Sequence, residues 1–212
     1  MIDFSALSQK VIDGDVEATG EMTRAALKAK VSPEEILNQG LIPGIRKVGE
    51  LFGAGKSFLP ELLMAGKAMN TAMAILEPEL TKAKVGPRGR YMIGTVRGDM
   101  HDIGKNIVVM LLQSNGWEVT DLGVDVSPED FCAAVAKGNY QIVGMSALLT
   151  TTMATVKESI EALKAAGLRD KVKVMVGGAP MTQEWATRAG ADGYASDGAE
   201  AVIVAEALIR RK

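Results

Sequence analysis

The fold is decided by residues 91–104, which read YMIGTVRGDMHDIG. The apolar run that opens this stretch is typical of a buried strand, and the pattern from Ile103 onward is typical of a helix. His101, the only histidine of the chain, therefore lies in a loop at the carboxyl end of a strand, where open α/β sheets bind their ligands. There the imidazole can coordinate a metal while the nearby carboxylate of Asp99 orients it.

The rest of the second half continues this alternation of strand and helix. Strands are expected over residues 91–96, 118–122, 141–146, 172–177 and 193–195. Helices are expected over residues 103–115, 128–137, 152–166, 182–189 and 198–210. The alternation predicts an α/β fold with a flavodoxin-like, doubly wound parallel sheet of five strands in the order 2-1-3-4-5. Its switch point would lie between the first and third strands.

The first half, residues 1–80, has apolar residues at helical spacing and predicts a bundle of four or five helices. Residues 14–15 mark a first break between helices. Ser32 is the expected N-cap of a helix whose capping box Glu35 closes. The Pro43–Gly44 pair is expected to kink or interrupt the run that follows.

A long helix is expected from Leu59 to Leu80, and residues 81–90 after it hold four basic residues, two glycines and a proline. That composition is typical of a linker. We therefore expect a helical domain over residues 1–80, a linker over residues 81–90 and an α/β domain over residues 91–212.

Composition bounds the class of protein. Hydrophobic residues make up 47% of the chain and charged residues 24%, which is ordinary for a soluble globular protein. The net charge of -2 gives no reason to expect a nucleic-acid partner, and no apolar run is long enough to span a membrane. Residues 1–5 lack the features of a signal peptide. The single cysteine, Cys132, suits a reducing compartment, so a cytoplasmic location is expected.

Two further loops should lie beside His101 at the same edge of the sheet. One begins at Ser146, after the third strand, and the other holds the pair Gly177–Gly178, after the fourth. Taken singly, each feature has a plain structural explanation: a surface histidine, a serine that caps a turn, a glycine turn. Together they place an imidazole, a carboxylate, a hydroxyl and a glycine platform on one rim.

These motifs, taken in order, resemble the signature of the cobalamin-binding fold. The signature here consists of Asp99-x-His101-x-x-Gly104, then Ser146-x-Leu148 after 41 residues (105–145), then Gly177-Gly178 after 28 more (149–176). In the helical half, residues 51–60, LFGAGKSFLP, resemble the cap segment of methyl-transferring corrinoid proteins. The resemblance therefore spans nearly the whole chain. It is to the corrinoid subunits of anaerobic methyltransferase systems and the cobalamin-binding modules of methionine synthase.

The resemblance implies a chemistry for the histidine loop. In the family the nucleotide base of the corrinoid leaves the cobalt, and the protein histidine takes the lower axial position, so His101 is the expected metal ligand. Asp99 would accept a hydrogen bond from the other ring nitrogen, and Ser146 would extend this relay. Gain or loss of a proton in the relay would couple axial bonding to methyl transfer, which makes Asp99 and Ser146 the expected catalytic residues.

The resemblance also implies which residues contact the cofactor, cobalamin or a related corrinoid. Gly104 would permit tight packing where its helix begins. Phe52 and Leu59 would cover the upper face of the corrin and exclude water, although they could instead simply pack the helical bundle. The full set of expected corrinoid contacts is Met100, Asp102, Ile103, Gly104, Leu148, Thr150, Gly177, Gly178, Ala195, Phe52 and Leu59.

Two other kinds of site are excluded by the residues present. Residues 53–57 end like a phosphate-binding P-loop, but that motif needs glycine where Glu50 stands, and it should follow a strand. One histidine and one cysteine cannot supply a zinc tetrahedron of nitrogen and sulfur ligands.

The resemblance favours a methyl carrier, which accepts a methyl group from a substrate-specific methyltransferase. It would donate that group through a second methyltransferase to tetrahydrofolate or coenzyme M, with a corrinoid reductive activator as a further candidate partner. The chain has no room for a substrate-activating barrel, so a subunit is expected and not an autonomous enzyme. The sequence does not distinguish methylamines, methanol, betaines and aryl methyl ethers as donors.

Three alternatives are weaker. A cobalamin-dependent sensor would usually add an output domain, and light sensors of this type place tryptophan in the cap, whereas Trp117 and Trp185 lie in the α/β half. The small subunit of a cobalamin-dependent mutase shares the histidine motif, but the cap segment argues against it. A flavodoxin-like domain without cobalt leaves the three motifs unexplained.

Overall fold

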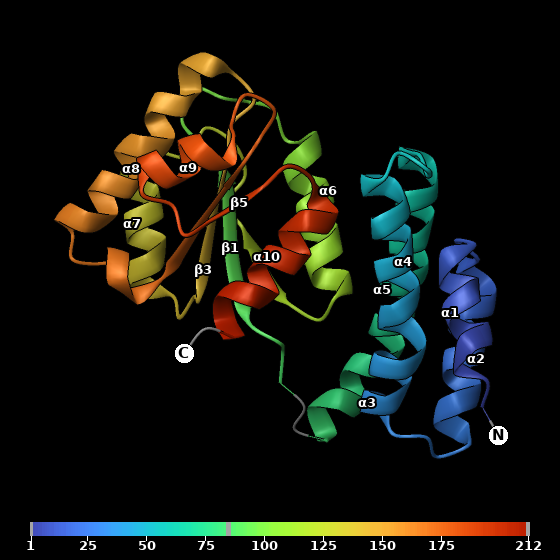
Figure 1. The fold of residues 1–212 in the computed structure, drawn as a ribbon. Coiled ribbons are helices and arrows are strands. Elements are labelled where there is room, and N and C mark those ends of the chain that lie inside the picture. The colour runs from blue at the N-terminus through green and yellow to red at the C-terminus, as the bar shows by residue number, and fades with distance from the viewer. Residues whose placement is uncertain (1, 84–85, 211–212) are drawn as a thin grey trace. The chain divides into compact units, whose positions relative to one another are not determined.

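The computed structural model describes residues 2–83 and 86–210, and the chain divides into two compact units, Met1–Pro87 and Arg88–Lys212 (Figure 1). The boundary falls inside the predicted linker, residues 81–90. The last helix of the first unit continues to Lys82, two residues into that linker, and the first strand of the second unit begins at Arg90. Residues 84 and 85 of the predicted linker lie outside the described residues.

The first unit is helical. Its elements are α1 (Phe4–Ile12), α2 (Val16–Lys28), α3 (Pro33–Glu35), the π-helical segment η1 (Ile36–Leu41), α4 (Ile42–Gly53) and α5 (Leu59–Lys82). Helix α1 packs on η1 and α4, and α2 packs along α5. The apolar positions read from the sequence face inward, and the fully buried side chains include Leu7, Val11, Ile45, Leu62 and Leu76.

The predicted helix cap at Ser32 and the predicted interruption near Pro43–Gly44 are both present in this unit. The Ser32 hydroxyl caps α3 by accepting the Glu35 N–H at 3.1 Å, and it also donates to the Glu35 carboxylate at 3.1 Å. The predicted interruption near Pro43–Gly44 takes the form of the π segment η1, which ends just before the first turn of α4 that holds Pro43. Proline has no N–H to donate and is tolerated in the first turn of a helix, so α4 begins anew there.

The second unit is built on one parallel sheet. Its strands are β1 (Arg90–Thr95), β2 (Glu118–Asp121), β3 (Ile142–Ser146), β4 (Lys173–Gly177) and β5 (Gly193–Ala195), in the order β2-β1-β3-β4-β5. This is the predicted order. The register aligns Thr95 with Ser146, Ser146 with Gly177, and Gly177 with Ala195. The carboxyl ends of four strands therefore form one row, which is where the predicted site residues begin.

Helices cover both faces of the sheet (Figure 1). Helices α6 and α10 pack together, and α8 packs against both α7 and α9. The helix bounds are α6 (Ile103–Ser114), α7 (Pro128–Lys137), α8 (Met153–Ala165), α9 (Gln183–Ala189) and α10 (Gly198–Arg210), with short 3-10 turns at Thr150–Thr152 and Arg169–Lys171. The core between sheet and helices includes Met92, Phe131, Val143, Ile160 and Val174. The predicted doubly wound α/β fold is confirmed.

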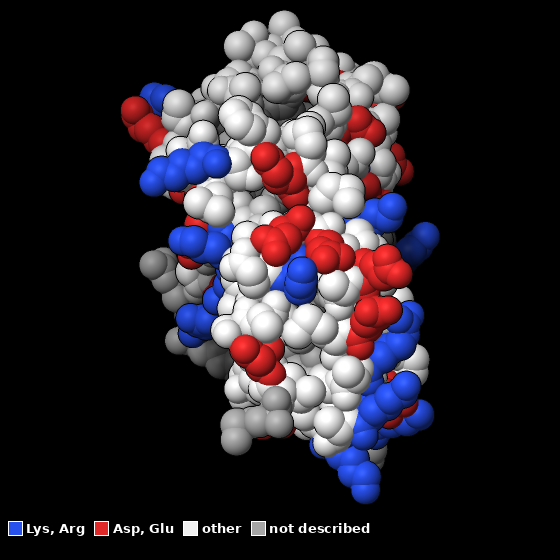
Figure 2. Space-filling view, turned by 90° about the vertical axis from the view of Figure 1, so that its right-hand side faces the viewer, with Lys and Arg blue, Asp and Glu red and all other residues white. Residues whose placement is uncertain are grey.

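Exposed charges of both signs lie on the helices of the first unit. On α2 they are Glu17, Glu21, Arg24 and Lys28. Figure 2 shows Lys and Arg side chains interspersed with Asp and Glu on the face that it presents. None of the described helices is long and apolar enough to cross a membrane.

Candidate functional site

The loop that carries His101 is held by a second loop beside it. After β1, Val96 forms an isolated bridge with Val126, and the chain turns at Gly98, whose positive φ of 86° favours glycine. The Gly98 N–H donates to the Asp125 carboxylate at 2.7 Å, and the Asp125 N–H donates to the Asp99 carbonyl at 3.2 Å. Asp125 itself has a φ of 56°, a strained conformation that residues other than glycine keep where their surroundings enforce it.

Asp99 is the centre of the site. It is fully buried, and one oxygen, Oδ1, lies 2.7 Å from the imidazole Nδ1 of His101 and accepts the His101 backbone N–H at 3.0 Å. The other oxygen, Oδ2, accepts the N–H groups of Leu148 at 2.7 Å and Leu149 at 3.2 Å, and the hydroxyl of Thr152 at 2.8 Å. One buried carboxylate thus joins the loop after β1 to the loop after β3.

These contacts decide the charge of Asp99. Burial raises the pKa of this carboxyl, but the donors from the His101 backbone and ring, from Leu148 and from Thr152 outweigh burial and hold its pKa well below the usual value. Asp99 is therefore an anion at neutral pH. An anionic acceptor at Nδ1 requires the proton on that nitrogen, which leaves the lone pair of the neutral imidazole on Nε2.

His101 is fixed at its backbone and open at its ring. Its carbonyl accepts the Thr95 hydroxyl at 3.0 Å, while its side chain is 51% exposed. Within the described residues, Nε2 makes no hydrogen bond. A ring that a carboxylate orients through one nitrogen, with the other nitrogen open, is the arrangement that metal-ligating histidines share. The predicted contact between Asp99 and the histidine ring is present.

The hydroxyl that contacts Asp99 in the structure is not that of Ser146, which the predicted relay named. Among the described residues, the hydroxyl that donates to Asp99 is that of Thr152, which is buried in the 3-10 turn before α8. Ser146 ends β3 and accepts the Val96 N–H at 3.0 Å through its carbonyl. Thr152 escaped the prediction because it lies outside the three motifs, although Thr150–Thr152 was a visible run of hydroxyls.

Apolar side chains surround the His101 loop and face solvent. Met100 is 68% exposed and Ile103 70%, and Leu148 and Leu149, whose N–H groups bind Asp99, are exposed as well. Large exposed apolar groups gathered at one place mark a binding surface. Leu149 was not among the predicted contacts.

The glycines of the site have different roles. Apart from its chain neighbours and the backbone of its own helix, a Cβ at Gly104 would meet no atom of the described residues within 4 Å, so the position leaves open space at the start of α6 and the expected tight packing is not with this part of the protein. A Cβ at Gly178 would lie 1.9 Å from the Ala147 carbonyl oxygen, and one at Gly177 would lie 2.9 Å from that of Ala195. The glycine pair thus lets the ends of β3, β4 and β5 approach one another closely.

The remaining predicted contacts of this unit lie on the same edge of the sheet. Thr150 and Asp102 are exposed, and Asp102 is the N-cap residue of α6. Ala195, at the end of β5, is 7% exposed. The donor set therefore fits a group that brings its own metal and a broad apolar surface: one imidazole nitrogen, an apolar rim and a backbone cradle cleared by glycine.

The two predicted cap residues lie in the first unit. Phe52 is in the last turn of α4 and Leu59 is the first residue of α5, and both are partly buried. The expected exposed loop is confined to the residues between them, where Phe58 is 70% exposed. The P-loop reading is excluded here too, because α4 and not a strand precedes this segment.

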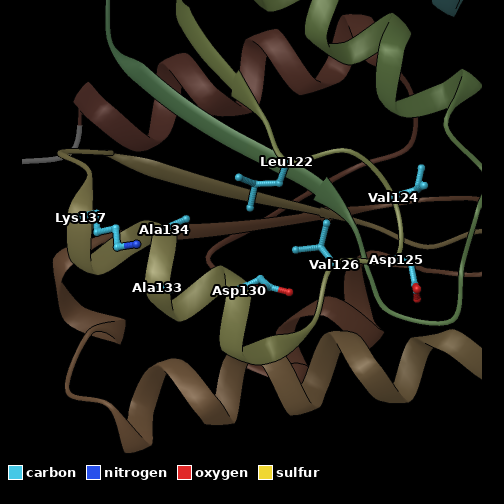
Figure 3. A pocket seen from close by; sticks show the side chains of 8 residues that line it. All are labelled: Leu122, Val124, Asp125, Val126, Asp130, Ala133, Ala134 and Lys137. Atoms are coloured by element: carbon cyan, nitrogen blue, oxygen red, sulfur yellow. The ribbon is translucent and has the colours of Figure 1, made fainter.

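A hollow of about 430 Å³ lies between the end of β2 and α7 (Figure 3). Its lining comprises Leu122, Val124, Asp125, Val126, Asp130, Ala133, Ala134 and Lys137. None of these is a predicted site residue. Asp125 connects the hollow to the histidine loop through its bond to Gly98.

The described residues offer no second metal site built from protein side chains. Across residues 2–83 and 86–210, no group of three or more His, Cys, Asp or Glu side chains is placed to hold a metal ion. Cys132, in α7, is partly buried, and burial raises the pKa of its thiol, as fits a structural cysteine.

Comparison with protein families gives two matches. A B12 binding domain matches residues 89–203, which include the whole of the site around His101. A second kind of B12 binding domain matches residues 4–77, which cover the helical unit from α1 through most of α5. The two matches together follow the division into two units.

Curated relatives match over nearly the full length of both chains. Dimethylamine corrinoid protein 3 of Methanosarcina acetivorans is 45% identical over 212 residues, 99% of this chain and 100% of the relative. Trimethylamine corrinoid protein 1 of the same organism is 42% identical over 201 residues, 94% of this chain and 93% of the relative.

Solved structures share the fold. A cobalamin-binding protein from Desulfitobacterium hafniense DCB-2 aligns with a TM-score of 0.85 at 34% identity, covering 98% of this chain and 99% of the other. A chain of the methanol:cobalamin methyltransferase complex MtaBC from Methanosarcina barkeri aligns with a TM-score of 0.83 at 32% identity, covering 97% of this chain and 79% of the other.

Proposed function

This chain belongs to the B12-binding corrinoid proteins of methyltransferase systems, and from this premise we propose that it carries a methyl group on the cobalt of its corrinoid between two methyltransferases. Its cofactor is cobalamin or a related corrinoid. When bound, that group supplies a cobalt ion that can accept and release methyl. The observation that carries the proposal is the pairing of an exposed His101 ring with a fully buried, anionic Asp99 at 2.7 Å.

His101 is proposed as the lower axial ligand, through Nε2. Asp99 holds the ring in one orientation and keeps the proton on Nδ1, so the free nitrogen is the one that can bind cobalt. Thr152, Leu148 and Leu149 hold Asp99 in turn. His101, whose basicity Asp99 raises, would hold the cobalt, and the proton on Nδ1 would set the strength of that bond.

The corrinoid contacts are proposed along the carboxyl edge of the sheet. Met100, Ile103 and Leu148 offer apolar surface to the lower face, and the open space at Gly104 lets a planar group approach the start of α6. The nucleotide tail would follow the row of strand ends. Its proposed contacts are Asp102, Ser146, Thr150, Gly177, Gly178 and Ala195.

The upper face of the corrinoid is proposed to be covered by the segment from Phe52 to Leu59. Apolar groups there would exclude water from a cobalt-bound methyl group. Support comes from the exposed Phe58 within the segment and from Leu63 and Met64 in the next turns of α5, which are 49% and 46% exposed. Apolar side chains exposed on one end of a bundle fit a surface that covers a ligand.

The partners are proposed from the relatives. Methylamines are the first donors to test, because relatives named for dimethylamine and trimethylamine match nearly the full chain. A methyltransferase specific for the donor would load the corrinoid, and a second methyltransferase would pass the methyl group to tetrahydrofolate or coenzyme M. A reductive activator and a cytoplasmic location complete the proposal.

The proposal is tested by incubating the purified protein with hydroxocobalamin, removing the unbound pigment and recording the visible spectrum. The wild-type chain should retain the corrinoid, and His101→Ala should retain it with an altered spectrum, because the imidazole is lost but the contact surface stays. Gln113→Ala, an exposed position on α6, is the matched control and should match wild type. A folded wild-type protein that retains no corrinoid would refute the proposal.

The donor is tested separately with the loaded protein. Methyl transfer is measured with methyltransferases specific for dimethylamine, trimethylamine and methanol, each with its own substrate. Transfer with a methylamine enzyme and not with the methanol enzyme is expected. Transfer with the methanol enzyme alone would leave the carrier role intact and contradict the assignment of methylamines.

A further inference from the structure

A lysine lies buried beside the site, and the chemistry proposed above does not use it. Lys105, in the first turn of α6, is 3% exposed, although lysine is among the residues least often buried. Its ammonium group forms an ion pair with the carboxylate of Asp121, the last residue of β2, whose side chain is 34% exposed. The charge is therefore removed from water on the lysine side only.

Such a pair is weak grounds for stability. Removing an ammonium group from water costs several kcal/mol, and an apolar residue of similar size in its place is often neutral or stabilising. Helix α6 already packs through apolar residues such as Leu111 and Leu112, which are fully buried. The role of the ion pair therefore lies in its position and not in a contribution to the stability of the fold.

A chain of hydrogen bonds runs from Lys105 to the residue that follows His101. The ammonium group donates to the side-chain oxygen Oδ1 of Asn106 at 2.8 Å, and the side-chain Nδ2 of Asn106 donates to the Asp102 carboxylate at 3.1 Å. The Asn106 backbone N–H also donates to the Asp102 carbonyl at 2.7 Å. The start of α6 is thus held to the end of β2 through side chains.

The histidine is held differently on its two sides. Two residues that precede His101 hold its backbone: Asp99 accepts the His101 N–H, and the Thr95 hydroxyl donates to the His101 carbonyl. The residue that follows His101 is Asp102. It is fixed by bonds from Asn106, whose side chain Lys105 orients. The direction in which the imidazole leaves the loop depends on both sides.

We propose that Lys105, paired with Asp121 and acting through Asn106 and Asp102, is a positioning residue that sets the angle at which His101 presents Nε2 to the cobalt. The inference rests on the proposed function for the identity of the metal. It concerns how tightly His101 binds as an axial ligand, and it assigns no contact between Lys105 and the corrinoid.

The first test uses the protein without corrinoid. Because the chain has one histidine, ¹⁵N-labelled histidine gives a single set of imidazole NMR signals, which report the Nδ1–H bond to Asp99. Lys105→Met and Asp121→Asn should each shift and broaden these signals, because the ring is less well oriented. Lys157→Met, an exposed lysine on α8, is the control and should leave them unchanged.

The second test loads cobalamin and measures, by visible and EPR spectra, the ratio of His-ligated to unligated cobalt. Lys105→Met should lower that ratio by about 10-fold, the lower end of the range for outer partners of metal ligands. Asn106→Ala should lower it in the same direction. Since Asn106 is exposed, this variant breaks the path to Asp102 with little effect on folding.

A purely structural role predicts a different pattern. If Lys105→Met lowers the melting temperature while the imidazole signals and the ligation ratio stay as in wild type, the inference is overturned. If Lys105→Met does not fold, Asn106→Ala and Asp121→Asn decide by the same two readouts. A wild-type chain that binds no corrinoid would refute the proposed function, and the NMR test would still decide whether Lys105 orients the ring.

Discussion

The two units present their predicted site residues in different ways. In the α/β unit, His101 and Asp99 lie on one loop at the end of a parallel sheet, and hydrogen bonds from four other residues fix them. In the helical unit, Phe52 and Leu59 flank a turn between two helices and offer only apolar surface.

The comparison separates two kinds of functional residue. A hydrogen bond is directional, so a buried carboxylate with several donors determines the geometry of its site within one unit. Apolar contact is not directional, so the geometry of residues that cover a ligand depends on the ligand that they contact. Changes to the residues that bond Asp99 should therefore alter both stability and ligation, and changes in the cap segment should alter the protection of the ligand and not its ligation.

The largest effect is expected at the glycine pair of the sheet edge. Gly178→Ala should destabilise the protein by about 2–5 kcal/mol, because its φ of 132° is strained for alanine and the new Cβ would overlap the Ala147 carbonyl oxygen. Denaturant unfolding measures this. Gly104→Ala is the matched control: its Cβ would meet no atom of the described residues beyond its own helix, so stability should be kept while corrinoid retention falls. Equal losses of stability in both variants would contradict the different roles of the two glycines.

A smaller effect is expected at the buried carboxylate. Asp99→Asn keeps the shape but turns an acceptor oxygen into a donor that faces other donors, which should cost about 1–3 kcal/mol in the free energy of unfolding. It should also weaken axial ligation by about 10- to 100-fold, since the ring loses the partner that fixes its tautomer. Urea titration and the spectrum of the loaded protein measure the two effects. Unchanged ligation would show that Asp99 only supports the fold.

The next pair of variants distinguishes the two hydroxyls. Thr152→Val removes one donor to Asp99 at nearly constant volume and should cost about 1 kcal/mol, with weaker ligation. Ser146→Ala leaves every bond to Asp99 in place, so the ligation spectrum should stay as in wild type. A ligation spectrum that changes in Ser146→Ala and stays as in wild type in Thr152→Val would restore Ser146 to the relay.

The smallest effect on the histidine site is expected from the cap segment. Phe52→Ala and Leu59→Ala should leave the ligation spectrum as in wild type, because neither residue belongs to the unit that holds His101. They should instead speed the replacement of the upper water ligand of bound aquocobalamin by added azide, which is followed by visible absorbance. A change in ligation without faster exchange would assign these residues to the fold and not to the cap.

The sequence predicted the frame of the molecule better than the details of its site. Strand order and helix bounds followed from periodicity, because alternating strands and helices in one sheet leave few topologies. The contact between Asp99 and His101 was expected from their spacing in the loop and from the family resemblance. The role of Thr152 did not, because it depends on how the 3-10 turn after β3 folds back over Asp99.

The same limit applies to Gly104, Asp125 and Lys105. A motif shows that glycine stands at position 104 but not whether a protein atom or open space lies beside it. The bond from Gly98 to Asp125 and the pair of Lys105 with Asp121 join residues far apart in the chain, which spacing within a motif cannot reveal.

The central claim is that His101 binds cobalt, and the presence of one histidine makes it directly testable. The protein is prepared with ¹⁵N-histidine, loaded with cobalamin and reduced to the Co(II) state, whose EPR spectrum is split by the nucleus of the axial nitrogen. Ligation by His101 predicts a doublet splitting in place of the triplet given by ¹⁴N. A triplet that persists in the labelled protein would show that the cobalt keeps the base of its own nucleotide, and would contradict the account.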